Sequence, residues 1–195
     1  MVMERPRSLE IGAKVRQSFD NWHLDGVGKP IRISFLPAGS EDTASSRIRV
    51  YSLQKAMAKQ GVCAAVGFEP ESDVVVVQKK VTDEILNLAG KAKDQGAAIV
   101  YDVDDLSSAL DYWTSPAHFR AILELADLVT TDTAGHREFL MRNCEASRVE
   151  IVPDCIDYYP DSPCPVLTKD AAPLRVMWFG SISNIDLFEK YSEIL

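Results

Sequence analysis

Residues 97–105, AAIVYDVDD, form an apolar run that ends in a cluster of aspartates. An apolar run followed by small polar or acidic residues recurs at residues 127–133, 149–157 and 174–181. Each run has the length of a buried strand, and helix-length segments separate most of them. This alternation predicts an α/β fold with a doubly wound parallel sheet. Such sheets bind ligands outside the carboxyl ends of their strands, so the polar clusters predict a site at that edge.

The earlier part of the chain alternates in the same way. Periodicity predicts strands at residues 31–36, 62–68 and 73–77, and helices at residues 47–60, 81–95, 116–126 and 134–143. Ser46 is the predicted N-cap of the first of these helices. The run at 73–77 is apolar at consecutive positions, which predicts a strand buried on both faces. Residues up to 152 therefore predict one complete α/β domain with right-handed crossovers.

The predicted domain organisation has four parts. Residues 1–29 form an N-terminal helical extension, residues 30–158 the α/β domain and residues 159–173 a proline-rich linker. Residues 174–195 supply the first strand and helix of a second, similar domain, which the sequence does not complete. We therefore expect the activity to require a continuation beyond Leu195.

The composition excludes several classes of protein. A net charge of −8 without a basic stripe argues against a nucleic-acid partner. The apolar runs are only strand-length, so no transmembrane helix is expected, and the N-terminus lacks the apolar core of a signal peptide. The four cysteines lack metal-type spacing. Reduced thiols and a cytoplasmic location are therefore expected, with a Cys155–Cys164 disulfide as the less favoured alternative.

The densest cluster of candidate catalytic residues is Asp102, Asp104 and Asp105. Carboxylates this close repel one another, which favours a bound cation, hydrogen bonds to sugar hydroxyls or a raised pKa. The structural alternative is that Asp105 or Ser107 caps the next helix and the other carboxylates are solvated.

Four segments, at residues 44–49, 127–132, 149–157 and 175–181, resemble the retaining family 4 type of GT-B glycosyltransferases, and they occur in the order of that family. The resemblance implies that residues 30–158 form a Rossmann-like acceptor-binding domain and that residues 174–195 begin the donor-binding domain. It implies transfer of a sugar from a nucleotide-diphosphate-sugar co-substrate to a hydroxyl of a glycan or lipid-linked acceptor, with retention and without a metal cofactor. A lipid-linked acceptor would bring the protein into peripheral contact with a membrane.

The resemblance also implies roles for individual residues. Asp104 falls where many family members carry a histidine, and it would face the transferred sugar. Asp102 or Asp105 would hold acceptor hydroxyls or the loop. Gly180 and Ser181 would contact the diphosphate of the donor. The candidates for binding the acceptor are Ser45, Ser46, Arg47, Thr131, Asp132 and His136.

Each of these smaller motifs has a purely structural alternative. Ser45 and Ser46 are equally compatible with a surface loop that ends in a serine cap. Arg47 is compatible with a solvated helix face. His136 lies in the first turn of a predicted helix, where an ordinary surface histidine is common. Gly180-Ser181 is also compatible with a plain tight turn.

The sequence departs from the family where the donor should bind. The lysine–glycine pair after the first donor-domain strand is absent, Asp154-Cys155 replaces asparagine–glycine, and the donor-binding glutamates would lie beyond Leu195. We therefore expect this chain alone to be inactive.

Two other functions are compatible with the motifs. An apolar strand ending in Asp-x-Asp also opens haloacid-dehalogenase-like phosphohydrolases, with Asp102 as nucleophile, Asp104 as general acid and a bound Mg²⁺. However, Asp105-Leu106 stands where that family has Gly-Thr. The third possibility is a non-catalytic glycan-binding module that keeps the fold without the chemistry.

Overall fold

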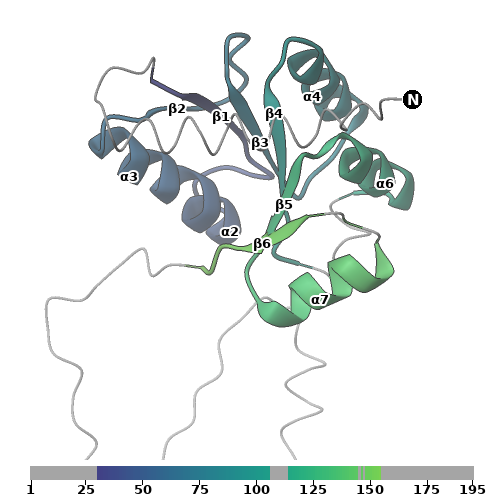
Figure 1. The fold of residues 1–195 in the computed structure, drawn as a ribbon. Helices are drawn as coiled ribbons and strands as arrows, with labels where there is room; N and C mark the ends of the chain where they lie inside the picture. Colours follow the sequence, from purple (N-terminus) through teal and green to yellow (C-terminus); the bar gives the residue numbers. More distant parts are fainter. Residues whose placement is uncertain (1–29, 106–113, 145, 147, 155–195) are drawn as a thin grey trace, which may run out of the picture. The chain divides into compact units, whose positions relative to one another are not determined.

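A computed structural model describes residues 30–105, 114–144, 146 and 148–154 of the chain (Figure 1). All of them belong to the first of the two units into which the chain divides, Met1–Tyr158. The predicted N-terminal extension, the linker and the start of the second domain, with Gly180 and Ser181, lie outside the described residues.

The described strands form one six-stranded, all-parallel sheet. Their bounds are β1 Arg32–Leu36, β2 Cys63–Val66, β3 Val74–Gln78, β4 Ala98–Asp102, β5 Leu128–Thr131 and β6 Val149–Ile151. The strand order is β2-β1-β3-β4-β5-β6, with β3 and β4 at the centre. Four of the five residues of β3 are buried, which confirms the prediction that the strand at residues 73–77 is covered on both faces.

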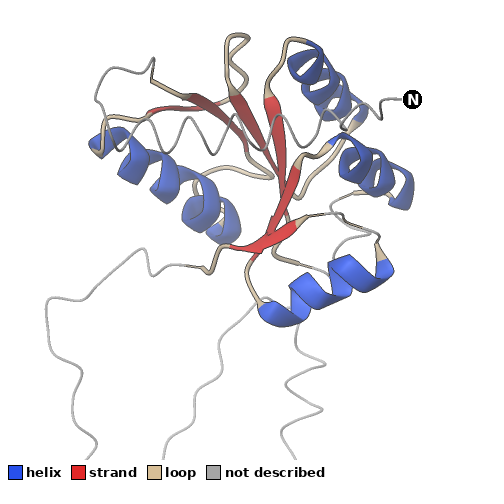
Figure 2. Cartoon of the chain, in the orientation of Figure 1, coloured by secondary structure: helices blue, strands red, loops and turns tan. Residues whose placement is uncertain are grey.

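Helices cover both faces of the sheet, so the predicted doubly wound, Rossmann-like fold is confirmed (Figure 2). One face carries a continuous helical segment made of α2 Ala44–Ser46, η1 Arg47–Ser52 and α3 Leu53–Lys59. The opposite face carries α4 Asp83–Asp94, α6 Pro116–Leu125 and α7 Ala134–Asn143. None of the described helices is both long and apolar enough to cross a bilayer.

The sheet separates two apolar cores, because alternate residues of a strand point to opposite faces. The core under α4, α6 and α7 contains Val75, Val77, Ala89, Ile99, Tyr101, Ile122 and Leu140. The core under η1 and α3 contains Ile33, Phe35, Val50, Val74 and Ala98. Toward the carboxyl ends of the strands, the buried residues Ser46, Arg49, Gln78 and Asp102 are polar and interact in pairs.

The strand order reverses between β1 and β3. After β1 the chain moves to β2 on one side, then returns across β1 to β3 and continues through β4, β5 and β6. In open α/β sheets this switch point opens a crevice at the carboxyl ends of the two strands that flank it. The residues that follow Leu36 and Gln78 are therefore positioned to line a site.

The prediction that Ser46 is an N-cap is wrong. The helical segment begins at Ala44, and Thr43 stands at the N-cap position. Residues Arg47–Ser52 form a π-helical turn, which the predicted helical period did not include. Ser46 lies inside the segment because its hydroxyl is hydrogen-bonded to groups at the ends of β1 and β3.

Candidate functional site

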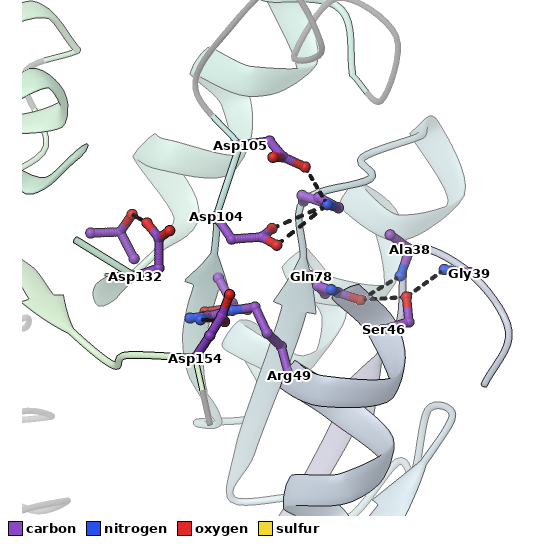
Figure 3. A network of polar contacts seen from close by, with 12 residues as sticks. Ala38, Gly39, Ser46, Arg49, Gln78, Asp104, Asp105, Asp132 and Asp154 are labelled. Atoms are coloured by element: carbon purple, nitrogen blue, oxygen red, sulfur yellow. Dashed lines mark hydrogen bonds and ion pairs between the residues drawn. The ribbon is translucent and has the colours of Figure 1, made fainter. Parts of the chain in front are cut away.

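A directed chain of hydrogen bonds lies at the switch point (Figure 3). The Gly39 N–H donates to Ser46 Oγ at 3.0 Å, and Ser46 Oγ donates to Gln78 Oε1 at 2.8 Å. The Ala38 N–H donates to the same Gln78 oxygen at 3.0 Å. Ser46 is fully buried and fully engaged in this chain, whereas the other two acceptor-binding candidates nearby, Ser45 and Arg47, are half-buried.

Next to this chain, Arg49 binds Asp102 in a buried bidentate ion pair. Arg49 Nε and Nη2 donate to Asp102 Oδ2 and Oδ1 at 2.7 and 2.6 Å, and Thr130 Oγ1 donates to Oδ1 at 2.6 Å. Arg49 and Asp102 are 7% and 5% exposed. Planar pairing of this kind is among the stronger charge-assisted contacts in proteins. Both oxygens of Asp102 are thus hydrogen-bonded within the protein.

Arg49 also holds the chain that leaves β6. Its Nη1 donates to Asp154 Oδ1 at 2.7 Å and to the carbonyl oxygen of Val152 at 3.0 Å. One guanidinium therefore joins η1, the end of β4 and the residues after β6, and Thr130 of β5 joins them through Asp102. We refer to Arg49, Asp102, Thr130, Asp154 and the Val152 carbonyl as the Arg49 network.

A second buried cation, Lys79, follows β3. Its side chain is 3% exposed, and its Nζ lies 2.5 Å from Asp105 Oδ2 and 3.2 Å from Asp104 Oδ1. Lys79 has a φ of +33°, in the left-handed region that non-glycine residues rarely adopt. Hydrogen bonds from Lys79 N to Asp102 O and from Tyr101 Oη to Lys79 O hold this strained backbone. Strain of this kind at a strand end is a frequent property of functional sites.

Asp104 differs from its two neighbours in the cluster. Burial raises the pKa of its carboxyl group, the charge of Asp105 adds to this effect, and Lys79 opposes it. Its Oδ1 atom has no hydrogen-bond partner among the described residues, and neither has Gln78 Nε2. The raised pKa is one of the outcomes expected from the sequence, but burial, and not repulsion within the cluster, is its main cause.

A histidine–aspartate pair follows β5. His136 Nδ1 lies 2.5 Å from Asp132 Oδ1, and the hydroxyl of the fully buried Thr131 lies 3.4 Å from the same oxygen. The Thr133 hydroxyl caps α7 by accepting from the His136 N–H at 3.2 Å. Burial acts to raise the pKa of Asp132, but the hydrogen bond and charge of His136 outweigh it and lower this pKa. The Asp132 and His136 side chains are 20% and 35% exposed, so the pair is open to a ligand.

The structure thus brings Asp102, Asp104, Asp105, Thr131, Asp132 and His136 to neighbouring strand ends, as the sequence predicted. The cations beside the aspartate cluster are side chains of the protein, Arg49 and Lys79. No three His, Cys, Asp or Glu side chains among the described residues form a group that could hold a metal ion.

Sequence reasoning missed Gln78, Lys79 and the buried ion pair of Arg49. The signal for the first two was present, because Gln78-Lys79-Lys80 follows the apolar run of β3 as the aspartates follow β4. The buried position of Arg49 had no such signal, since its partner Asp102 is distant in the sequence.

Comparisons with protein-family models, with curated proteins and with solved structures found no match to this chain.

Proposed function

We propose that residues 30–158 form the acceptor-binding domain of a glycosyltransferase that moves a sugar from a nucleotide-diphosphate-sugar to a hydroxyl of a glycan or lipid-linked acceptor. The observation that carries the proposal is the balance of charge at the carboxyl edge of the sheet. The buried cations there, Arg49 and Lys79, are paired with carboxylates of the protein itself. Among the described residues at this edge, the groups that remain for a ligand are Asp104 Oδ1 and Gln78 Nε2, which lack hydrogen-bond partners, and the partly exposed Asp132–His136 pair.

This balance favours a neutral, hydroxyl-rich ligand over a phosphate. Phosphate sites offer positive charge or several converging N–H groups, since phosphate oxygens only accept hydrogen bonds. A hydroxyl both donates and accepts, so it can bond to a carboxylate such as that of Asp104 and to an imidazole such as that of His136. An acceptor alcohol or a sugar therefore fits this edge better than a nucleotide diphosphate does.

The phosphohydrolase alternative is less well supported. It requires Asp102 to attack a phosphoryl group with one of its oxygens. Asp102 is 5% exposed, and both of its oxygens accept hydrogen bonds from Arg49 or Thr130. A nucleophile held in this way would have to leave its ion pair before each reaction. We therefore favour sugar transfer over phosphate hydrolysis.

In the proposed reaction, this domain orients the acceptor hydroxyl, and a second domain binds the leaving diphosphate. Catalysis would rest on electrostatic stabilisation of the separating charges, with retention at the anomeric carbon. The residues described here would then supply positioning, and transfer by this chain alone would be absent.

Calorimetric titration of the chain with methyl glycosides, and separately with uridine and guanosine diphosphates, tests the proposal. We expect Mg²⁺-independent binding of at least one glycoside and weaker binding of both nucleotides. Asp132→Asn should weaken glycoside binding, because it removes one charge from the exposed pair with His136. Asp83→Asn is the matched control, since Asp83 pairs with His118 in a more exposed Asp–His contact. Mg²⁺-dependent hydrolysis of p-nitrophenyl phosphate by the chain would contradict the proposal.

A further inference from the structure

Two buried polar atoms at the carboxyl edge of the sheet, Gln78 Nε2 and Asp104 Oδ1, have no hydrogen-bond partner among the described residues. Gln78 is 0% exposed, and the Asp104 side chain is 9% exposed. They come from the ends of neighbouring strands, β3 and β4 (Figure 3). Buried polar atoms in folded proteins nearly always have partners, so an unpaired pair at a ligand-binding edge calls for a specific explanation.

The orientation of the Gln78 amide is fixed by its neighbours. The Ala38 N–H can only donate, so the atom that it contacts must be the amide oxygen. Ser46 Oγ already accepts from Gly39 N–H, and its own proton points to the same Gln78 oxygen. A flipped amide would place its NH₂ group against the Ala38 N–H. Gln78 Nε2 therefore has its N–H groups available for a partner outside this chain of bonds.

Asp104 supplies the complementary group. Lys79 Nζ lies closer to Asp105, at 2.5 Å, than to either oxygen of Asp104, at 3.2 and 3.5 Å. Asp104 Oδ1 thus receives charge stabilisation from Lys79 without a well-directed hydrogen bond. It is a buried acceptor just after β4, the strand that pairs with the one whose end carries the buried donor of Gln78.

We propose that Gln78 and Asp104 together bind one hydroxyl group of a sugar or related polyol. Gln78 Nε2 would donate to the hydroxyl oxygen, and Asp104 Oδ1 would accept the hydroxyl proton. The inference rests on the proposed function and specifies the ligand group that the site recognises. Gln78 was not among the residues that the sequence singled out.

The pairing of one donor with one acceptor selects the class of ligand. A phosphate oxygen would bond to Gln78 but be repelled by Asp104, and an ammonium group would bond to Asp104 but meet the N–H groups of Gln78. A hydroxyl satisfies both at once, as a water molecule does. A ligand hydroxyl can therefore replace water here without loss of hydrogen bonds.

The strained turn at Lys79 places both groups. Its left-handed backbone ends β3 directly after Gln78, while the Lys79 side chain reaches Asp104 and Asp105. The same residue thus ends the strand that carries the donor and contacts the loop that carries the acceptor.

Nuclear magnetic resonance of the isotope-labelled chain tests the inference, with methyl α-glucoside, methyl α-mannoside and methyl α-galactoside as probes. We expect at least one probe to shift the side-chain amide resonances of Gln78. Gln78→Glu keeps an oxygen for Ala38 and Ser46 but replaces the donor by an acceptor, and Asp104→Leu removes the acceptor. Each should raise the Kd of that probe by about tenfold or more, since a ligand hydroxyl then loses a buried partner.

Gln95→Glu and Asp94→Leu are the matched controls, because they make the same changes at exposed positions near the end of α4. Both should bind the probe as the unsubstituted chain does. If Gln78→Glu or Asp104→Leu fails to fold, the Gln78 amide shifts in the unsubstituted chain decide the question.

The outcomes separate this inference from the proposed function. A glycoside that binds equally to all variants and leaves the Gln78 amide unshifted overturns the inference but leaves the proposed function standing. A direct Gln78–Asp104 hydrogen bond that no probe disturbs also overturns it. Binding of inorganic phosphate or uridine diphosphate at these residues, without binding of any glycoside, overturns both.

Discussion

The Arg49 network and the Gln78–Asp104 pair lie side by side at the carboxyl edge of the sheet, yet they differ in what they leave unpaired. In the Arg49 network, both oxygens of Asp102 accept hydrogen bonds, and the guanidinium donates to Asp102, Asp154 and a carbonyl. In the Gln78–Asp104 pair, the buried Nε2 of Gln78 and the buried Oδ1 of Asp104 have no hydrogen-bond partner among the described residues, although Lys79 lies within ion-pair distance of Asp104.

Adjacent buried polar groups can therefore have different roles, one in holding the folded structure and the other in binding a ligand. A buried charge that is fully paired contributes to the folded structure, and removing one partner is costly. A buried group that is left unpaired lowers stability, and binding a ligand compensates for that loss. We therefore assign Asp102 to the structure and Asp104 to the ligand, although only Val103 separates them in the sequence.

The largest effect is expected when the Arg49 network is broken. Arg49→Met would leave the buried Asp102 carboxylate without its cation and should lower the free energy of unfolding by about 3 to 5 kcal/mol. Urea unfolding at neutral pH measures this loss. Arg142→Met is the control, because Arg142 is exposed and pairs only with Glu138 among the described residues, so its removal should change stability by less than about 1 kcal/mol. Equal losses in the two variants would show that the network is not structural.

A smaller loss is expected when only one donor of the Arg49 network is removed. Thr130→Val keeps the shape of the side chain but removes the hydrogen bond to Asp102 Oδ1, while both bonds from Arg49 remain. The free energy of unfolding should fall by about 1 to 2 kcal/mol, measured by urea unfolding. No loss would mean that Arg49 alone satisfies Asp102.

Asp104→Asn should affect the pH dependence of stability more than stability itself. Burial raises the pKa of Asp104 in the folded chain, so the folded state holds this proton more tightly than the unfolded state does. The unsubstituted chain should therefore lose stability as the pH rises from the ordinary aspartate pKa through the raised value. The asparagine side chain of the variant does not titrate. As the pH rises over that range, the variant should therefore become more stable relative to the unsubstituted chain.

Unfolding midpoints of both proteins across a pH series measure this difference. At neutral pH the variant should lie within about 1 kcal/mol of the unsubstituted chain, or above it. A difference that stays constant with pH, or that moves against the variant as the pH rises, would contradict the assignment of Asp104.

The smallest effect is expected at the His136–Asp132 pair, because both side chains are partly exposed to solvent. His136→Gln should raise the pKa of Asp132 toward its ordinary value, since His136 is what lowers it. The stabilisation from the ionised carboxylate is present above the ordinary aspartate pKa and is lost as the pH falls through the lowered pKa. Titration of the Asp132 carboxyl carbon by nuclear magnetic resonance measures the shift.

The stability loss in His136→Gln should be about 0.5 kcal/mol or less at neutral pH. His118→Gln serves as the control, because it removes a histidine from a pair with the exposed Asp83 and should leave Asp132 unchanged. An unchanged pKa of Asp132 in His136→Gln would mean that the pair does not form in solution.

Periodicity in the sequence was sufficient to predict the fold. Apolar runs bounded by turn residues indicated the strands, and the helix predicted at residues 134–143 has the bounds of α7. The N-cap at Ser46 was wrong because capping rules describe local hydrogen bonds. The hydroxyl of Ser46 is instead held by Gln78, 32 residues away.

The location of the candidate site was predictable, but which of its residues are paired within the protein and which are left for a ligand was not. Strand ends in a parallel sheet meet at one edge, so the polar clusters after β4 and β5 had to lie close together. Asp102 and Asp104 look alike in the sequence, and they differ because Asp102 meets Arg49, 53 residues earlier. No local pattern reveals such a contact, nor that Lys79 lies between Asp104 and Asp105.

Urea unfolding of Asp102→Asn and Asp104→Asn, measured side by side at neutral pH, tests the central distinction most directly. The account predicts a loss of about 3 kcal/mol for Asp102→Asn, because the buried Arg49 then keeps only the half-exposed carboxylate of Asp154 among the described residues. For Asp104→Asn it predicts a change of less than about 1 kcal/mol or a gain. Equal losses in the two variants, or a larger loss in Asp104→Asn, would contradict it.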